Sequence, residues 1–257
     1  MITSAWMALA ALLVLMTVVW VVSLRLHDVS IVDIVWGPAI VLTTWIYMLN
    51  AVITTDRQFV VIGLIHLWAT RLVIHLARRN WGHPEDKRYQ NMRKTRGPSF
   101  RWTSLVIVFW LQAGIAWLIS FPLLVSIQAS SVTPLNWLDA LGLTLFSVGL
   151  IFETVADWQL GHFKANPVNA ECVCDRGLWR YTRHPNYFGE ALLWWGVWCF
   201  AAVSTGALWT IVSPILLTIL LLKVSGVSLL EQTLTDTKPA YSDYIARTSA
   251  FLPWFPK

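Results

Sequence analysis

Charged residues are scarce in this chain. They make up 13% of its 257 residues, whereas a soluble domain carries about a quarter, so an ordinary water-soluble fold is excluded. Only three cysteines are present, and such an odd, sparse set provides no disulfide framework. The chain also lacks a long Ser-, Gly- or Pro-rich linker, an acidic run or an internal repeat. We therefore expect a single membrane domain over residues 1–257.

Apolar stretches take the place of the missing charge, because 56% of the residues are hydrophobic. A helix needs about 20 apolar residues to cross a hydrocarbon core of about 30 Å, and the 17 tryptophans suit a membrane interface. The sequence predicts an all-α integral membrane protein with seven transmembrane helices. We place these helices at residues 5–24, 30–50, 58–77, 103–125, 137–160, 186–203 and 208–230.

Basic residues fall unevenly between the predicted loops. Of the 19 Lys and Arg residues, 17 lie on one side of the predicted membrane, Arg57 lies on the other, and Arg71 lies within a span. The positive-inside rule then predicts an outside N-terminus and a cytoplasmic C-terminus, most simply in a bacterial inner membrane. Because this topology accounts for most of the net charge of +5, we expect membrane lipids as partners and no nucleic acid.

Ionisable side chains occur within or beside several predicted spans, where they are costly unless they face a protein interior or a water-filled cavity. They are Asp33, His66, Arg71, His75, Glu153, Asp157, Glu190 and Glu231. Glu153 and Asp157 are four residues apart and share one helix face. These two acids could form a structural pair that Arg or Lys of a neighbouring helix neutralises, or they could bind a ligand.

Residues 177–190 form the densest polar segment. Pro185 suits the first turn of a helix, so this basic, aromatic loop is predicted to lead directly into the sixth span. Arg183 and His184 precede that helix N-terminus and could hold phosphate. Flat surfaces for a base or sugar would come from Trp179, Tyr181 and Tyr187. Asn186 and Glu190 would lie on one face of the helix beneath the bound group. An interfacial belt of aromatic and basic residues is the alternative.

Residues 183–190 (RHPNYFGE) resemble the C-terminal signature of the steroid 5-alpha-reductase superfamily, in particular its bacterial branch. The resemblance continues through Glu231, Tyr244, Arg247 and residues 250–256, and it extends back through Glu153 and Asp157. Earlier strings typical of the bacterial branch lie at 32–37 (VDIVWG), 78–82 (RRNWG) and 85–89 (EDKRY).

This resemblance implies a seven-helix enzyme of lipid metabolism whose C-terminal half, residues 131–257, binds NADPH from the cytoplasm. The N-terminal half, residues 1–130, would form the cavity for the substrate. The implied reaction transfers hydride to an activated C=C bond of a steroid, sterol or other lipid-soluble molecule. The enzyme would thus be an oxidoreductase acting on CH–CH donors, like 3-oxo-5-alpha-steroid 4-dehydrogenases.

The resemblance also implies roles for individual residues. Asp157 would contact the polar face of NADPH with Glu153 nearby, and Asn186 and Glu190 would hold the nicotinamide amide. Phosphate partners would be Lys164, Arg183 and Arg247. The remaining cofactor residues would be Trp179, Tyr181, His184, Tyr187, Glu231 and Tyr244.

Catalysis in the steroid enzymes also uses an acid and a tyrosine from the N-terminal half. The place of the acid corresponds to Asp33, and a buried carboxyl kept neutral by desolvation could donate a hydrogen bond to a carbonyl. The place of the tyrosine falls within residues 66–71 (HLWATR), which contain none. Either His66 or Arg71 takes its role as electrophile, or the substrate is not an enone of the steroid kind.

Membrane methyltransferases are the main alternative. Isoprenylcysteine and phospholipid methyltransferases share an Arg-His-Pro-x-Tyr string and a later Glu, and they bind S-adenosylmethionine. His184, Tyr187 and Glu231 would then hold that cofactor, although residues 230–232 read LEQ where those enzymes generally have a paired Glu-Glu.

A transporter or lipid-binding scaffold, with Asp33, Arg71 and Glu153 along a path, is disfavoured because the halves show no inverted repeat. We expect no metal, because Cys172 and Cys174 are too few ligands and the six histidines are scattered.

Overall fold

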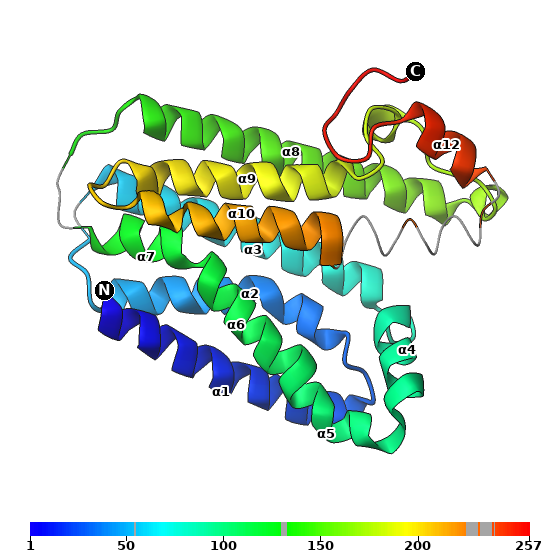
Figure 1. Cartoon of the computed structure of the whole chain (residues 1–257), viewed down its shortest axis with the longest axis horizontal. Coiled ribbons are helices and arrows are strands. Elements are labelled where there is room, and N and C mark those ends of the chain that lie inside the picture. The colour runs from blue at the N-terminus through cyan, green and yellow to red at the C-terminus, as the bar shows by residue number, and fades with distance from the viewer. Residues whose placement is uncertain (54, 130–132, 225–230, 232–237, 239) are drawn as a thin grey trace. The chain divides into compact units, whose positions relative to one another are not determined.

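The computed structural model describes residues 1–53, 55–129, 133–224, 231, 238 and 240–257, and within these ranges every regular element is helical (Figure 1). The chain divides into two compact units. Unit 1 comprises Met1–Leu135 with Ser204–Thr210, and unit 2 comprises Asn136–Val203 with Ile211–Lys257. The expectation of one domain with halves at 1–130 and 131–257 stays a prediction.

Unit 1 begins with three long helices and continues with shorter helical segments. They are α1 (Ile2–Leu26), α2 (Ile31–Leu49), α3 (Asp56–Asn80), α4 (Lys87–Arg96), α5 (Phe100–Ser104), a π-helical turn (Leu105–Trp110), α6 (Leu111–Ile119) and α7 (Phe121–Gln128). A capping box formed by Thr55 and Gln58 starts α3. Helix α2 packs against both α1 and α3.

Large side chains join the helices of unit 1. The Trp117 indole donates to the Ala5 carbonyl at 2.7 Å, and the Trp36 and Trp68 rings meet edge to face at 6.1 Å. The Tyr47 and Ser120 hydroxyls lie 2.6 Å apart in the core. Buried indoles and phenols need partners for their polar ends, and here other helices of the unit provide them.

Unit 2 is built on a long antiparallel helix pair, visible in Figure 1 as the green α8 and the yellow α9. Its elements are α8 (Trp137–Ala165), two 3₁₀ turns (Pro167–Asn169 and Gly177–Arg180), α9 (Pro185–Ala202), α10 (Val212–Ile219), a π-helical turn (Leu220–Val224) and α12 (Tyr241–Arg247). A further 3₁₀ turn, Leu208–Ile211, precedes α10.

Glycines bring α8 and α9 into backbone contact at two levels. A Cβ on Gly149 would lie 2.6 Å from the Gly189 carbonyl oxygen, and one on Gly142 would lie 2.8 Å from that of Gly196. No side chain fits at such a separation, so these positions require glycine. Close approach through small residues is a common way for helices to associate in membranes.

Five helical segments are long and apolar enough to cross a membrane. They are Ile2–Leu26, Ile31–Leu49, Asp56–Asn80, Lys87–Ile119 and Trp137–Ala165, and they overlap the first five predicted spans. The prediction of a helical membrane protein is thereby confirmed at this coarser level, whereas seven spans and the orientation stay predictions.

The last two predicted spans give shorter or more polar helices. In α9, Asn186, Glu190 and three tryptophans lower the mean hydropathy of an 18-residue helix. The apolar helix Leu208–Lys223 covers only part of the predicted span 208–230, because residues 225–230 lie outside the described ranges.

Candidate functional site

The segment before α9 is seated on α8. Gly177 has a left-handed φ of 59°, and the next amide, of Leu178, donates to Gln159 Oε1 of α8 at 3.0 Å. The buried Trp179 indole donates to the Ala156 carbonyl, also on α8, at 3.0 Å. Trp179 therefore anchors the segment to α8. Its ring, which the sequence analysis expects to face the cofactor, packs in a small apolar cluster with Ala156.

Arg183 lies at the centre of a buried ionic cluster. Its Nε and Nη2 donate to the two carboxylate oxygens of Glu231 at 2.7 and 3.1 Å. Its Nη1 donates to the carbonyls of Ile245 and Thr248 at 3.2 and 2.5 Å. A bidentate pair of this kind gives strong, directional bonds. Arg183 thus fastens the C-terminal residues, and its predicted phosphate role would require exchange of these bonds.

His184 completes the same cluster. Its Nε2 lies 3.1 Å from Glu231 Oε1, and its ring stacks on that of Tyr187, with the centroids 5.5 Å apart and the planes 1° from parallel. The helix α9 begins at Pro185, immediately after His184, as the sequence predicts. The structure therefore brings together three of the predicted cofactor residues, Glu231, His184 and Tyr187.

Residues 249–257 lie along the segment that precedes α9. The Arg183 amide donates to the Ser249 carbonyl at 2.9 Å, and the Trp254 amide donates to the Tyr181 carbonyl at 2.9 Å. The Tyr244 hydroxyl donates to the Trp179 carbonyl. Predicted site residues far apart in the sequence are thus joined through main-chain groups, and Tyr244 is buried where they join.

Charge in this cluster is held by competing effects. Burial alone raises the pKa of Glu231, but hydrogen bonds from His184 and Arg183 outweigh it and lower that pKa to about 2. Burial and the Glu231 charge raise the pKa of Tyr241 to about 12. Glu231 is therefore ionised and Tyr241 is neutral throughout the physiological range.

Asn186 links α9 to α8. Its Nδ2 donates to Asp157 Oδ1 at 3.1 Å, and its own Oδ1 accepts from the Tyr187 amide at 3.1 Å. One turn further on, Glu190 Oε1 accepts from the Trp194 indole at 3.1 Å. Glu153 is buried on the α8 face that meets Gly189. The α8–α9 interface thus holds all four predicted cofactor residues with amide or carboxyl groups on these two helices.

Lys164 and Arg247 are the exposed cations among the predicted phosphate partners. Arg247 Nη2 contacts Asp175 Oδ2 at 2.7 Å, with half of the Arg247 side chain exposed. An exposed pair of this kind contributes about 0–1 kcal/mol, so it exchanges readily with a phosphate group. Tyr181, also partly exposed, meets Phe255 edge to face at 6.1 Å.

A second polar cluster lies in unit 1, around Asp33 of α2. Asp33 Oδ2 accepts from Arg88 Nη2 at 2.7 Å, and Oδ1 accepts from the Tyr89 hydroxyl at 2.9 Å. Asp86 caps α4 and also binds Arg88, at 3.0 Å. The sequence analysis expects Asp33 to act as a neutral carboxyl that donates to a substrate carbonyl, and in the structure this carboxyl accepts from Arg88 and Tyr89.

His66 and Arg71 lie on α3. The Trp45 indole donates to His66 Nε2 at 2.9 Å, and Nδ1 lies 2.8 Å from the Ile62 carbonyl. These contacts describe a neutral imidazole with its proton on Nδ1 and no donor left at Nε2. Arg71, the other predicted electrophile, is half-buried.

Tyr89 contacts Asp33 but is not among the site residues that the sequence analysis predicts. The resemblance calls for a tyrosine beside the acid and points to residues 66–71, but the tyrosine that contacts Asp33 comes from α4. The signal was present in the string at 85–89, which ends in this tyrosine. Nothing in the sequence places that string against α2, because the contact spans 56 residues.

Among the residues that the structure describes, no group of three or more His, Cys, Asp or Glu side chains is placed to hold a metal ion.

Comparison with known proteins shows the family to which the chain is similar. The model of a family described as "Protein of unknown function (DUF1295)" matches residues 19–248. This family is related to steroid 5-alpha-reductase-like proteins. An uncharacterized protein of Schizosaccharomyces pombe is 28% identical over 228 residues, which is 77% of this chain and 65% of that protein. The chain thus spans about two thirds of its relative, and no solved structure matches it.

Proposed function

We propose that this chain, which belongs to the DUF1295 family, is an NADPH-dependent membrane reductase acting on a lipid-soluble unsaturated substrate. The observation that supports it best is the joining of residues 179–190, Glu231 and the C-terminal residues into one polar, aromatic cluster at the start of α9. These are the residues on which the resemblance to steroid 5-alpha-reductases rests.

The side chains of this cluster suit the parts of NADPH. Arg247 and Lys164 are exposed cations for phosphate groups, and Tyr181 with Phe255 offers aromatic surface for a base. Asn186 and Glu190 provide the amide and carboxyl groups that a carboxamide can bond. Glu231 and Arg183 neutralise each other, so in this proposal they hold the segment in place and the exposed cations bind phosphate.

When bound, NADPH supplies the hydride that adds to the activated double bond. The chain must then stabilise the negative charge that develops on the substrate carbonyl oxygen. In this proposal, the Tyr89 hydroxyl gives up its hydrogen bond to Asp33 and donates its single proton to that oxygen, while Arg88 holds Asp33 beside it. This assignment gives unit 1 the acid and tyrosine that the resemblance requires, with Tyr89 in place of His66 or Arg71.

Binding of NADPH to the detergent-purified chain and its variants tests the cofactor assignment. We expect Asn186→Ala and Glu190→Ala to weaken binding by roughly ten-fold or more, as lost hydrogen bonds to a buried ligand do. The matched controls Asn166→Ala and Glu171→Ala remove an exposed amide and an exposed carboxyl of the same unit and should leave affinity unchanged. Equal affinity in all four variants would remove Asn186 and Glu190 from the site.

A methyltransferase is the second candidate, and one contact favours it. His184 and Tyr187 stack beside Glu231, which groups the three residues expected to hold S-adenosylmethionine. Binding by the wild-type chain separates the candidates: the reductase requires NADPH, whereas the methyltransferase requires S-adenosylmethionine. In the second case Tyr187→Ala should abolish binding and Tyr89→Phe should not affect it.

A further inference from the structure

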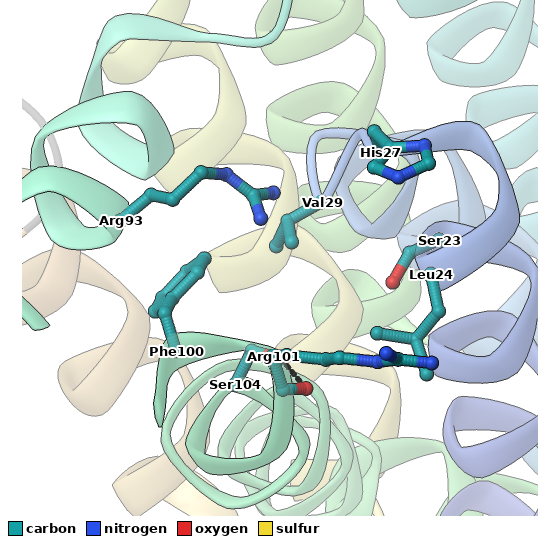
Figure 2. A pocket seen from close by; sticks show the side chains of 8 residues that line it. All are labelled: Ser23, Leu24, His27, Val29, Arg93, Phe100, Arg101 and Ser104. Atoms are coloured by element: carbon teal, nitrogen blue, oxygen red, sulfur yellow. Dashed lines mark hydrogen bonds between the residues drawn. The ribbon is translucent and has the colours of Figure 1, made fainter. Parts of the chain in front are cut away.

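A cavity of about 270 Å³ opens in unit 1 where α1 ends and α5 begins, far along the sequence from the predicted cofactor residues (Figure 2). Arg93, Arg101 and His27 contribute its basic side chains. Figure 2 shows both arginines extending toward the α1 side of the cavity, where His27 and Ser23 lie. Phe100 and Ser104 are buried and close the α5 side.

All three basic groups have spare hydrogen-bonding capacity. Within the described residues, the Arg101 guanidinium makes no ion pair and lies over the face of the Trp102 ring, 5.5 Å from its centroid. The His27 ring makes no hydrogen bond or ion pair within those same ranges. Arg93 uses Nε and Nη2 on Glu85, at 3.1 and 2.8 Å, and keeps Nη1. Glu85 forms an ion pair with Arg93, and the Asp28 carboxylate also interacts electrostatically with Arg93.

The backbone positions these groups without help from a ligand. His27 ends α1 in the left-handed conformation, with a φ of 55°. The Trp20 indole donates to the Arg101 carbonyl at 3.1 Å, and the Ser104 hydroxyl donates to the same carbonyl at 3.1 Å. Arg101 is thus held against α1 by its main chain, and its guanidinium is left for other partners.

Exposed apolar side chains lie on the same helical segments as the residues of the cavity. Val22 and Leu26 of α1 are exposed, as are Trp102 of α5 and Val106 of the following turn. An exposed tryptophan beside basic side chains is typical of the membrane interface. A ligand with a charged head at the cavity and an apolar body along these residues would match both surfaces.

We propose that this cavity, which we call the α1–α5 basic cavity, binds the phosphate group of an anionic phospholipid. Ligand pockets for larger molecules span roughly 300–1,000 Å³, so the cavity suits a headgroup and is too small for a dinucleotide. Arg101 and the free nitrogen of Arg93 bond the phosphate oxygens, and His27 contacts it from the opposite side. The acyl chains lie on the exposed apolar residues of α1 and α5.

Native mass spectrometry of the full chain in detergent tests this assignment, with phosphatidylglycerol and phosphatidylcholine of identical acyl chains as probes. We expect phosphatidylglycerol to bind more tightly, because the choline group cancels the phosphate charge. Arg101→Gln should weaken phosphatidylglycerol binding by roughly five-fold, the effect of one basic residue near an anionic lipid surface. Arg96→Gln, an exposed arginine of α4 outside the cavity, should leave it unchanged.

His27→Asn provides a second variant. It should keep the fold, because asparagine accepts the left-handed conformation at a helix end. It should also weaken phosphatidylglycerol binding. Glycerol 3-phosphate, which has the phosphate without acyl chains, should neither bind at comparable concentration nor displace the lipid. The proposal is overturned if Arg96→Gln and Arg101→Gln lose equal affinity, if the two lipids bind equally, or if glycerol 3-phosphate replaces the lipid.

Discussion

Units 1 and 2 pack their helices by different means. In unit 2 the backbones of α8 and α9 touch at Gly142 and Gly149, where an added Cβ would lie 2.6–2.8 Å from a backbone oxygen. In unit 1 the closest such approach, of Gly37 to the Ala69 carbonyl, is looser at 3.1 Å. Large side chains join the helices there, as the Trp117 indole does by bonding the Ala5 carbonyl. Where two backbones touch, there is no room for an added Cβ. Where side chains fill the interface, they can repack after a substitution.

The two units also differ in how far their charged groups are paired with each other. Arg183 and Glu231 in unit 2 satisfy each other and fasten the C-terminal residues to the start of α9. Unit 1 has one satisfied cluster around Asp33, and it also has the α1–α5 basic cavity, where Arg101 makes no ion pair within the described residues. Satisfied charges maintain a structure, while charges with spare donors are available to a ligand.

Removing the Glu231 carboxylate should have the largest effect. Glu231→Ala leaves the buried Arg183 guanidinium without its partner and should lower the free energy of unfolding by about 3 kcal/mol. Asp175→Ala breaks the exposed pair with Arg247 and should cost about 0–1 kcal/mol. Denaturation of both variants in detergent measures the difference, and equal losses would contradict the structural role given to Arg183.

Acid should reproduce part of this loss. The pKa of Glu231 is lowered from its ordinary value to about 2, so its contribution to stability is complete above about pH 4.5 and disappears as the pH falls toward 2. The difference in unfolding free energy between wild type and Glu231→Gln should therefore shrink across this range. A difference that stays constant from pH 5 to pH 2.5 would show that Glu231 is not the titrating group.

Adding one methyl group between α8 and α9 should have the next largest effect. Gly149→Ala places a Cβ 2.6 Å from a backbone oxygen and should destabilise unit 2 by about 1–3 kcal/mol. Gly161→Ala lies in the same helix with open space around it and should stabilise by about 0.5–1 kcal/mol through helix propensity. Thermal unfolding of the pair measures both signs, and a neutral Gly149→Ala would disprove backbone contact.

Loss of the Tyr89 hydroxyl should affect activity more than stability. Tyr89→Phe removes one hydrogen bond to Asp33, which corresponds to about 1 kcal/mol of unfolding free energy. If Tyr89 polarises the substrate, turnover should fall about a hundred-fold while NADPH affinity stays the same. Unchanged turnover with a competent lipid substrate would exclude Tyr89 from the reaction.

The smallest effect is expected in the side-chain packing of unit 1. Trp117→Phe keeps an aromatic ring but loses the indole bond to Ala5, so it should cost about 1 kcal/mol or less of unfolding free energy after repacking. A cost equal to that of Gly149→Ala, measured under the same conditions, would remove the distinction between the two units.

Local features of the sequence were sufficient for much of this fold. The length of the apolar stretches predicts the five helical segments that can cross a membrane. Pro185 marks the start of α9, because proline suits a first helical turn. The close contact of Gly149 with Gly189 was not predicted, because glycine frequency alone gives no pairing between helices.

Contacts between distant residues account for most of what the sequence could not show in the site. The roles suggested for Arg183 and Trp179 rest on residue type, and their geometry depends on carbonyls of α12 and α8 that no side-chain pattern reveals. Tyr89 was missed for the same reason. Residue chemistry identified the segment 177–190, while long-range hydrogen bonds decide which of its members face outward.

Cofactor binding by the wild-type chain tests the central claim most directly. The purified protein would be titrated in detergent with NADPH, NADH and S-adenosylmethionine, and the bound fraction would be measured by mass spectrometry and by thermal shift. The account predicts that NADPH binds and stabilises the protein, and that Asn186→Ala and Glu190→Ala reduce the shift at the same NADPH concentration. Binding of S-adenosylmethionine without any binding of NADPH would contradict it.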